Sequence, residues 1–286
     1  SMAIRVTKKG DEGKIGTALA RLMEEDRTLA YRVDAETGQQ IISGLGEQHL
    51  DAVVAKLKAK FGVDVELTAP RVAYRESVRK KCKVQGRHKK QTGGHGQFGD
   101  VWMRFEPGDT EELQFCEEVV GGAVPKNYFP AVEKGMREAV QHGVLAGYPV
   151  VYLKATLYDR SYHPVDSSEM AFKTAAQLAY KAALAQANPL LLEPIGELKV
   201  TIPDSYMGDV IGDLNSRRGM IMGMEALPGA QQGNAEVPLS EMFGYATDMR
   251  SKTQGRGQYT MEPAHCAEVP KSIAEKIISE RGKKSE

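Results

Sequence analysis

The stretch GGHGQFGDV, residues 93 to 101, contains the spacing G-x-G-x-x-G followed by x-V, which is typical of a loop that covers nucleotide phosphates. A dinucleotide-binding loop follows a hydrophobic strand and opens a helix, whose N-terminus receives the pyrophosphate. Here RHKKQT precedes the glycines, and DVWMRFE after them alternates as a strand. A protein-kinase loop does lie between strands, but the sequence has no H-R-D, D-F-G or A-P-E element and no G-x-x-x-x-G-K-[ST] loop. The glycine spacing therefore does not predict a nucleotide site.

A glycine-rich hairpin loop after a basic strand remains, and two interpretations of it stay open. The glycines permit close approach of the backbone to a ligand, and the other side chains offer polar and stacking contacts that suit RNA. Alternatively, the glycines only meet the geometry of a flexible turn. The residues concerned are Gly93, Gly94, Gly96 and Gly99, together with His95, Gln97 and Phe98.

A second polar cluster, SYHPVDSSE at residues 161 to 169, contains serine, histidine and aspartate within a few positions. A hydrolase assembles its triad from separate elements and adds an oxyanion hole, so this cluster does not predict hydrolysis. Because the cluster lies between an apolar strand and a long helix, we expect Asp166, Ser167 or Ser168 to cap that helix. No catalytic residue is predicted.

The cysteines indicate neither disulfides nor metal. Cys82, Cys116 and Cys266 are scattered, odd in number and without a C-x-x-C pair. The set Cys82, His88 and His95 matches no familiar zinc spacing and has no evident fourth ligand. We therefore expect no metal site and a reducing compartment.

Composition indicates a globular chain with uneven charge. The 286 residues are 41% hydrophobic and 27% charged, with zero net charge. No apolar run approaches the roughly 18 residues needed to cross a membrane, and no signal peptide is visible, so we expect a cytoplasmic location. Residues 75–90 carry eight Lys or Arg and one Glu, whereas residues 106–118 carry six acidic residues and no Lys or Arg. One end could therefore meet phosphate, although such a run is also typical of a solvated surface. Ser1 before Met2 resembles an expression scar, which suggests an engineered fragment.

The periodicities predict an α+β fold in which two βαββαβ segments, both ferredoxin-like in order, flank a different α+β segment. The first has strands at 4–7, 28–34, 40–46 and 63–67 and helices at 13–27 and 47–61. The last has strands at 196–203, 220–227, 235–240 and 257–264 and helices at 205–219, capped by Ser205, and 241–254. The middle has strands at 74–85, 100–107, 113–120 and 149–158 and helices at 131–143 and 169–187, with a short amphipathic helix at 271–284.

Six blocks in order and spacing resemble bacterial elongation factor G: GQQIISGLGEQHLD, KKQTGGHGQFGDV, VVGGAVPKNYFPAVEKG, YHPVDSSEMAFK, YMGDVIGDLNSRRG and EMFGYATDMRSKTQGRGQYTME. The resemblance covers nearly the whole chain. It places residues 1–70 in the family's ferredoxin-like third domain, residues 71–193 with 268–286 in its ribosomal-protein-like fourth domain, and residues 194–267 in its ferredoxin-like fifth domain.

The resemblance implies a role on the ribosome and no catalysis by this chain. In the family a GTP-binding domain and a β-barrel domain come first, so GTP and Mg are expected only in a missing N-terminal domain, which would be the GTPase. No cofactor is expected on this chain. The implied partners are both ribosomal subunits, tRNA and mRNA, with no membrane, and the chain is expected to be a monomer that supports tRNA–mRNA translocation during protein synthesis.

The resemblance also implies two sets of RNA-contacting residues. The tip of the fourth domain, formed by the loops matching Gly93 to Gly99 and Ser161 to Ser168, gives Lys89, Lys90, Gly94, His95, Gly96, Gln97, His163, Asp166 and Ser167. Contacts of the fifth domain with large-subunit RNA give Arg217, Arg218, Arg250, Ser251, Gln254 and Arg256.

Departures from the family pattern keep other roles open. The stretch QGRHKKQTGGHGQFGD and the proline in YHPVD suggest a divergent paralogue, which would act in ribosome recycling, in stress or in ribosome protection against antibiotics. A different class, a stand-alone RNA-binding module or a small nucleotide-using enzyme on the same scaffold, also stays open. Nucleotide binding would separate these classes.

Overall fold

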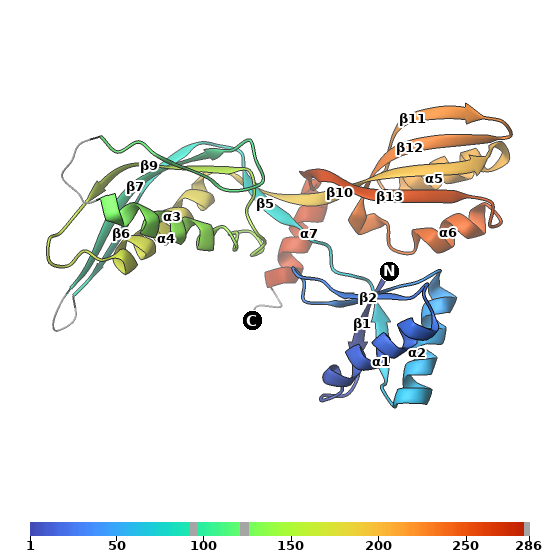
Figure 1. Cartoon of the computed structure of the whole chain (residues 1–286). Coiled ribbons are helices and arrows are strands. Elements are labelled where there is room, and N and C mark those ends of the chain that lie inside the picture. Colours follow the sequence, from blue (N-terminus) through green and yellow to red (C-terminus); the bar gives the residue numbers. More distant parts are fainter. Residues whose placement is uncertain (92–95, 121–125, 283–286) are drawn as a thin grey trace. The chain divides into compact units, whose positions relative to one another are not determined.

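The computed structural model describes residues 1–91, 96–120 and 126–282. It divides into two compact units, Ser1–Ala73 with Pro194–His265 and Tyr74–Glu193 with Cys266–Glu286. Within the described residues the elements are seven α-helices and three β-sheets, with three short 3-10 turns (Figure 1). The predicted α+β class is confirmed.

The N-terminal part of the first unit forms a four-stranded antiparallel sheet in the order β2-β3-β1-β4. Ile15, Leu19 and Leu22 recur at helical spacing and are all buried against this sheet, as amphipathic periodicity predicts. The predicted βαββαβ order is present. Its elements are β1 (Met2–Val6), α1 (Glu12–Glu25), β2 (Ala30–Val33), β3 (Gln40–Ser43), α2 (Glu47–Phe61) and β4 (Val65–Thr68).

The other sheet of this unit repeats the order as β11-β12-β10-β13 and has its own apolar core around Leu198 and Leu214. Two details differ from the prediction. Ser205 does not cap the first helix, because it lies inside a 3-10 turn, Asp204–Tyr206, that precedes the helix. The second helix begins only at Tyr245, because Gly244 has a left-handed φ of 75° that interrupts the helical backbone. The elements are β10 (Pro189–Pro203), α5 (Met207–Ser216), β11 (Met220–Leu227), β12 (Ala230–Pro238), α6 (Tyr245–Lys252) and β13 (Gln258–Glu268).

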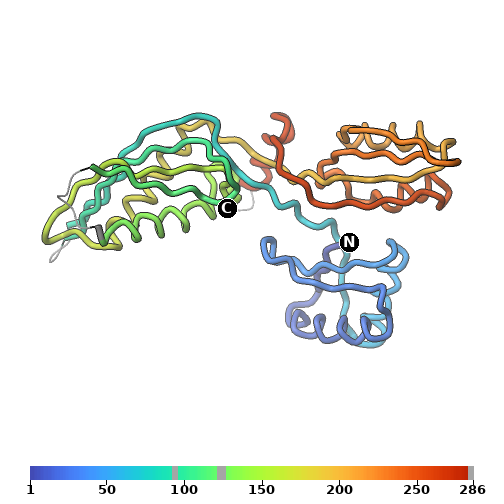
Figure 2. Tube along the Cα trace, turned by 45° about the horizontal axis from the view of Figure 1, so that its top comes forward, coloured from blue at the N-terminus to red at the C-terminus, as the bar shows by residue number. Residues whose placement is uncertain are grey.

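The second unit is built on a sheet in the order β6-β7-β9-β8, in which only β8 and β9 are parallel among the described pairs. The helices α3 and α4 lie together on one side of it (Figures 1 and 2). The elements are β5 (Arg75–Val78), β6 (Cys82–Lys90), β7 (Gln97–Pro107), β8 (Gln114–Glu117), α3 (Phe129–Ala139), β9 (Leu153–Ser161), α4 (Glu169–Gln186) and α7 (Lys271–Gly282).

The predicted single strand over residues 74–85 is wrong, because the structure divides it between two sheets. β5 pairs with the first part of β10, whereas β6 pairs with β7. Between them the backbone N–H groups of Arg79 and Lys80 donate to the carbonyl of Ala187, 3.1 and 3.0 Å away, just past the end of α4. A carbonyl distant in sequence therefore bends the chain, and no local turn residue marks the bend.

The helix α4 touches the β6–β7 hairpin backbone to backbone. A Cβ added at Gly99 would lie 2.3 Å from the carbonyl oxygen of Ala171, and one added at Gly86 would lie 2.1 Å from that of Ala175. Real Cβ atoms essentially never approach other heavy atoms so closely. The last glycine of the G-x-G-x-x-G spacing is therefore a packing residue beneath a helix.

An irregularity in β9 changes which side chains face the core. Trp102 pairs with Asp159 but the next residue, Met103, pairs with Leu157, so Tyr158 is an extra residue in β9. Beyond it Arg160 pairs with the buried Val101 and is itself buried. The Arg160 guanidinium carbon lies 3.8 Å from the centroid of the Phe129 ring.

A buried carboxylate organises the loop between α3 and β9. Glu76 is 1% exposed, and its Oε1 and Oε2 accept hydrogen bonds from the N–H groups of Leu145 at 2.5 Å and Tyr148 at 2.8 Å. The N–H of Ala146 adds a longer bond of 3.3 Å to Oε1. Burial raises the pKa of Glu76 above its ordinary value, although these hydrogen bonds oppose the shift.

The glycine contact makes a testable prediction. We expect Gly99→Ala to destabilise the second unit by about 1–3 kcal/mol, because its methyl group must displace helix backbone. Trp102, the chain's single tryptophan, lies in this unit and reports its urea unfolding by fluorescence. Gly282→Ala, where no atom of the described residues lies within 4 Å of the added methyl group, is the control and should not lower the midpoint. Equal midpoints for both variants would contradict the packing role.

The buried carboxylate predicts a pH dependence. With its pKa raised in the fold, Glu76 binds more protons in the folded than in the unfolded state, so its contribution to stability declines as pH rises from the unfolded value of 4.5 through the folded pKa. We expect Glu76→Gln to remove this decline while lowering stability at acidic pH, because one acceptor oxygen is lost. Urea midpoints from Trp102 fluorescence across this pH range test it, and parallel curves for the two proteins would contradict it.

Candidate nucleic-acid interface

Two loops that are far apart in sequence meet at one end of the second unit, and we call this place the tip. The backbone N–H of Gly96 donates to Oδ1 of Asp166 at 3.0 Å, and the N–H of Phe98 donates to the carbonyl of Asp166 at 2.8 Å. The structure thus joins the loop before β7 to the loop after β9. Gly94 and His95, also predicted at the tip, lie outside the described residues.

Local hydrogen bonds shape the loop after β9. The Oγ of Ser167 accepts from the N–H of His163 at 2.9 Å, and the N–H of Ser167 donates to the carbonyl of His163 at 3.1 Å. Of the three predicted capping residues, Ser168 caps α4, since its Oγ accepts from the N–H of Ala171 at 3.2 Å. The Asp166 side chain does not cap α4 and instead binds the loop before β7 through the N–H of Gly96.

Two polar side chains are exposed at the tip. His163 is 52% exposed, its Nδ1 lies 3.4 Å from Oδ2 of Asp166, and its ring centroid is 6.2 Å from that of Phe98. Gln97 is exposed, and its Oε1 lies 2.9 Å from Nε2 of His88. Both side chains can reach a ligand at this end.

Lysines flank these polar groups. Lys89 and Lys90 end β6 directly opposite Phe98 and Gln97 and are exposed. In the part of the chain that the structure describes, neither lysine forms an ion pair. Their charges are available to phosphate groups at the tip.

The predicted arginines of the first unit lie in a different environment. Arg217 is only 13% exposed, donates to the carbonyl of Glu241 at 2.7 Å and pairs with Asp213 at 3.1 Å and with Asp248. Arg218 pairs with the Glu241 carboxylate at 3.2 Å. Internal partners thus occupy the Arg217 guanidinium, which ties the end of α5 to the segment before α6.

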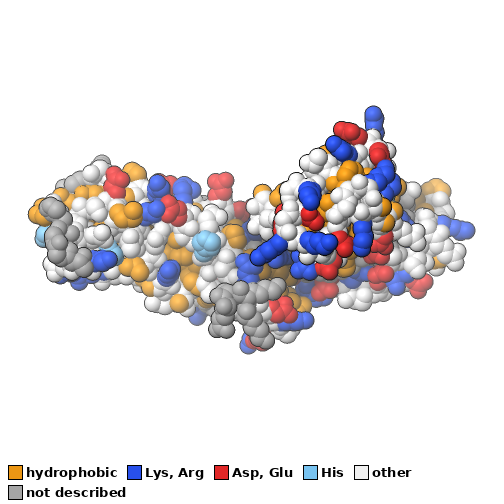
Figure 3. Space-filling model, turned by 90° about the horizontal axis from the view of Figure 1, so that it is seen from below, with side chains coloured by type: hydrophobic (Ala, Val, Ile, Leu, Met, Phe, Trp, Pro, Cys, Tyr) orange, Lys and Arg blue, Asp and Glu red, His pale blue; other side chains and the backbone are white. Residues whose placement is uncertain are grey.

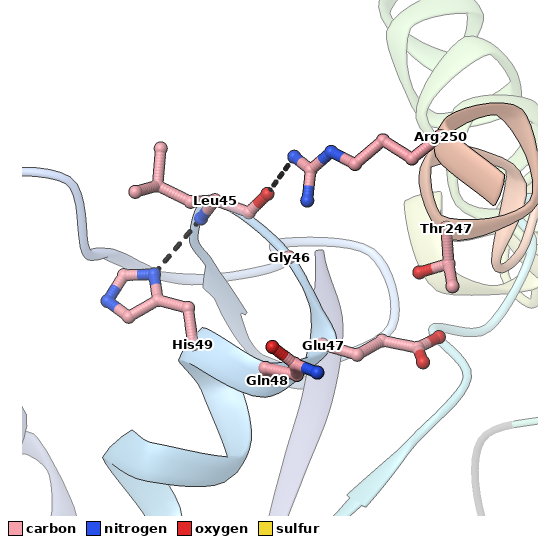
Figure 4. A pocket seen from close by; sticks show the side chains of 7 residues that line it. All are labelled: Leu45, Gly46, Glu47, Gln48, His49, Thr247 and Arg250. Carbon is pink, nitrogen blue, oxygen red and sulfur yellow. Dashed lines mark hydrogen bonds between the residues drawn. The ribbon is translucent and has the colours of Figure 1, made fainter. Parts of the chain in front are cut away.

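The remaining predicted residues of this set lie at or just after the end of α6. Ser251, Gln254 and Arg256 are exposed. Arg250 donates to the carbonyl of Leu45, in a hollow lined by residues 45–49 together with Thr247 and Arg250 (Figure 4). In the same hollow Nδ1 of His49 accepts from the N–H of Leu45 at 3.0 Å. Contact of Arg250, Ser251, Gln254 and Arg256 with RNA stays a prediction.

Known protein families and a solved structure match nearly the whole length of this chain. Consecutive family models match it: Elongation Factor G, domain III at residues 1–69, Elongation factor G, domain IV at residues 70–188, and Elongation factor G C-terminus at residues 190–277. The chain belongs to the elongation factor G family. A crystal structure from Thermus thermophilus is 46% identical with a TM-score of 0.89, over 99% of this chain and 42% of that chain. The chain thus spans less than half of the Thermus protein.

The family assignment confirms the resemblance found in the sequence, and it identifies the chain as the C-terminal part of a protein like a translation elongation factor. The tip falls inside the match to elongation factor G, domain IV. Residues 1–91, 96–120 and 126–282 contain no group of three His, Cys, Asp or Glu side chains that could hold a metal. Among the described helices, none is both long and apolar enough to cross a membrane.

The sequence missed an aromatic support beneath the tip of this elongation factor G domain. The hydroxyl of Tyr128 donates to the carbonyl of Ser167 at 3.3 Å. Its ring stacks on Phe172 of α4, with centroids 4.8 Å apart, and lies 5.9 Å from the ring of Tyr162. The 3-10 turn Lys126–Tyr128 carries the tyrosine, and its sequence has no periodicity that could have predicted this contact.

The bridge between the two tip loops is testable. We expect Asp166→Ala to speed hydrogen exchange of the Gly96 amide by about tenfold or more, because a hydrogen bond to a charged acceptor is worth about 1.5–3 kcal/mol. Val165→Ala, which shortens an exposed side chain in the same loop, is the matched control. Amide exchange measured by NMR tests this, and equal rates in both variants would show that the bridge does not hold the loop.

Proposed function

We propose that this chain is the ribosome- and tRNA-contacting part of an elongation factor G-like translational GTPase and supports tRNA–mRNA translocation during protein synthesis. The observation that carries the proposal is the bridge from Gly96 to Asp166, which joins two loops into one tip inside the domain IV match. Membership of the elongation factor G family favours the ribosome as the partner.

The chemistry of the tip suits recognition of RNA by shape. Lys89 and Lys90 supply charge for phosphates, while Gln97 and His163 supply hydrogen bonds and a ring on which a base or ribose can pack. Such contacts are not specific for sequence, as a factor that must engage many different codons requires.

We propose further that GTP hydrolysis belongs to another domain of the full-length protein and that this chain binds no nucleotide. The backbone contact between Gly99 and α4 supports this, because the glycine spacing that resembles a phosphate loop is used in packing. Calorimetry with GTP and with ATP should detect no binding, and micromolar binding would overturn this part of the proposal.

Pelleting with intact ribosomes across a salt series tests the main proposal. We expect binding that weakens as salt rises, since phosphate contacts release counterions. Gln97→Ala with His163→Ala should weaken binding by about tenfold, because loss of a stacking side chain costs about 1–3 kcal/mol per base.

The matched control is Gln141→Ala with His142→Ala, which removes the same two side-chain types from exposed positions just after α3. It should pellet like the unmodified chain. Equal weakening in both double variants, or no pelleting of the unmodified chain at any salt concentration, would contradict the proposal.

A further inference from the structure

The sheet of the second unit has a side that points away from α3 and α4. Val84, Val101 and Met103 are buried on the helix side, so the residues that alternate with them point to the opposite side. On β6 all of these alternating residues are exposed. We call the opposite side the outer face and define it by Lys83, Gln85, Arg87 and Lys89 of β6, Phe98 and Trp102 of β7, and Tyr158 of β9.

Aromatic rings hold two cations on the outer face. The Nζ of Lys83 lies 5.5 Å from the ring centroid of Tyr158, and the guanidinium carbon of Arg87 lies 5.7 Å from that of Phe98. Both distances are within the roughly 6 Å at which a ring attracts a cation. The rings therefore favour these positions of the two cations without neutralising their charge.

Carboxylates neutralise other parts of this sheet but not the outer row of β6. Glu106 pairs with Lys81 at 3.2 Å, and Glu118 pairs with Arg104 at 2.9 Å. In the described chain no ion pair involves Lys83, Arg87 or Lys89. Figure 3 shows basic and acidic side chains interspersed over the surface that is visible from below.

Two carboxylates lie beside the middle of this row, on β7 and β9. Asp100, opposite Arg87, is buried and accepts hydrogen bonds from Gln85 Nε2 at 2.8 Å and Ser161 Oγ at 2.7 Å. Asp159 is exposed, and its Oδ1 accepts from the N–H of Arg160 at 2.8 Å. Lys83, Arg87 and Lys89 thus outnumber these two carboxylates.

We propose that the outer face binds the sugar–phosphate backbone of an RNA strand, as a contact that shares Lys89 and Phe98 with the tip and extends beyond it along β6 to Lys83. The inference rests on the proposed function, because it names a second surface for the same class of partner. Lys83, Arg87 and Lys89 lie in one row of β6, in which every second residue is about 6.8 Å further along the strand, and a row of cations suits a linear polyanion. Trp102 lies within this array and offers a surface for a base or ribose.

Protection of a sheet edge is the competing explanation. β6 is an edge strand, and charged side chains on such strands discourage pairing with another sheet. That role requires charge alone, whereas the outer face also places Lys83 and Arg87 over aromatic rings. The two explanations predict different results for the same variant.

Trp102 makes the test specific, because it is the chain's only tryptophan and lies on the outer face. We would titrate the chain with poly-uridylate, a single-stranded RNA without internal pairing, and follow Trp102 fluorescence across a salt series. Binding should change the fluorescence, and affinity should fall with salt. Lys83→Gln with Arg87→Gln should make the log–log salt slope shallower by about 1.4, because each lost phosphate contact on a single strand removes about 0.7.

The matched control is Lys134→Gln with Lys181→Gln, which removes the same charge from exposed positions on α3 and α4. It should leave the slope unchanged. Equal slopes in the two double variants, or RNA binding without any change of Trp102 fluorescence, would overturn the inference. A Lys83→Gln/Arg87→Gln protein that aggregates by light scattering but keeps its slope would also overturn it and support edge protection.

Ribosome pelleting of the same proteins separates this inference from the proposed function. Pelleting that is weakened by Gln97→Ala/His163→Ala but not by Lys83→Gln/Arg87→Gln would overturn the outer-face contact while supporting the tip. A chain that never pellets, yet shows the Trp102 change and the shallower slope with poly-uridylate, would support the outer face while contradicting the proposed function.

Discussion

The second unit depends on the direct backbone contact between α4 and the β6–β7 hairpin. Gly86 and Gly99 leave room for the helix carbonyls of Ala175 and Ala171, so the backbones of helix and sheet approach each other directly. This contact fixes the tip, because Gly96 lies three residues before Gly99 and α4 begins right after the loop that holds Asp166. A longer side chain at either glycine would separate the two loops that meet there.

The helices that were best predicted are those whose ends are encoded locally. The helix α2 has the predicted bounds of 47–61, because its apolar stripe begins and ends with the segment. The break between β5 and β6 could not be predicted from the sequence. The bend is held by hydrogen bonds from the N–H groups of Arg79 and Lys80 to the carbonyl of Ala187, and no glycine or proline between the two strands marks a turn. Local patterns predict elements, but the partners of a backbone group can lie anywhere in the chain.

The candidate site shows the same limit. Sequence chemistry identified Asp166, Ser167 and Ser168 as equivalent capping residues, and only the structure separates the cap at Ser168 from the bridge at Asp166. The meeting of the two tip loops came from the family resemblance and not from residue spacing. For Arg217 the sequence showed a charge but not its neighbours, and the structure supplies Asp213 and Asp248 as internal partners.

The extra residue in β9 changes which residues of that strand face the core. Up to Leu157 the odd-numbered residues face the core, whereas beyond Tyr158 the even-numbered Arg160 does. A strand that alternated without interruption would direct Asp159 inward and remove Arg160 from Phe129. Because of this one inserted residue, odd-numbered residues face the core in the first part of β9 and an even-numbered residue faces it in the last part. The first part contributes aliphatic side chains to the core, and the last part places the Arg160 cation over the Phe129 ring.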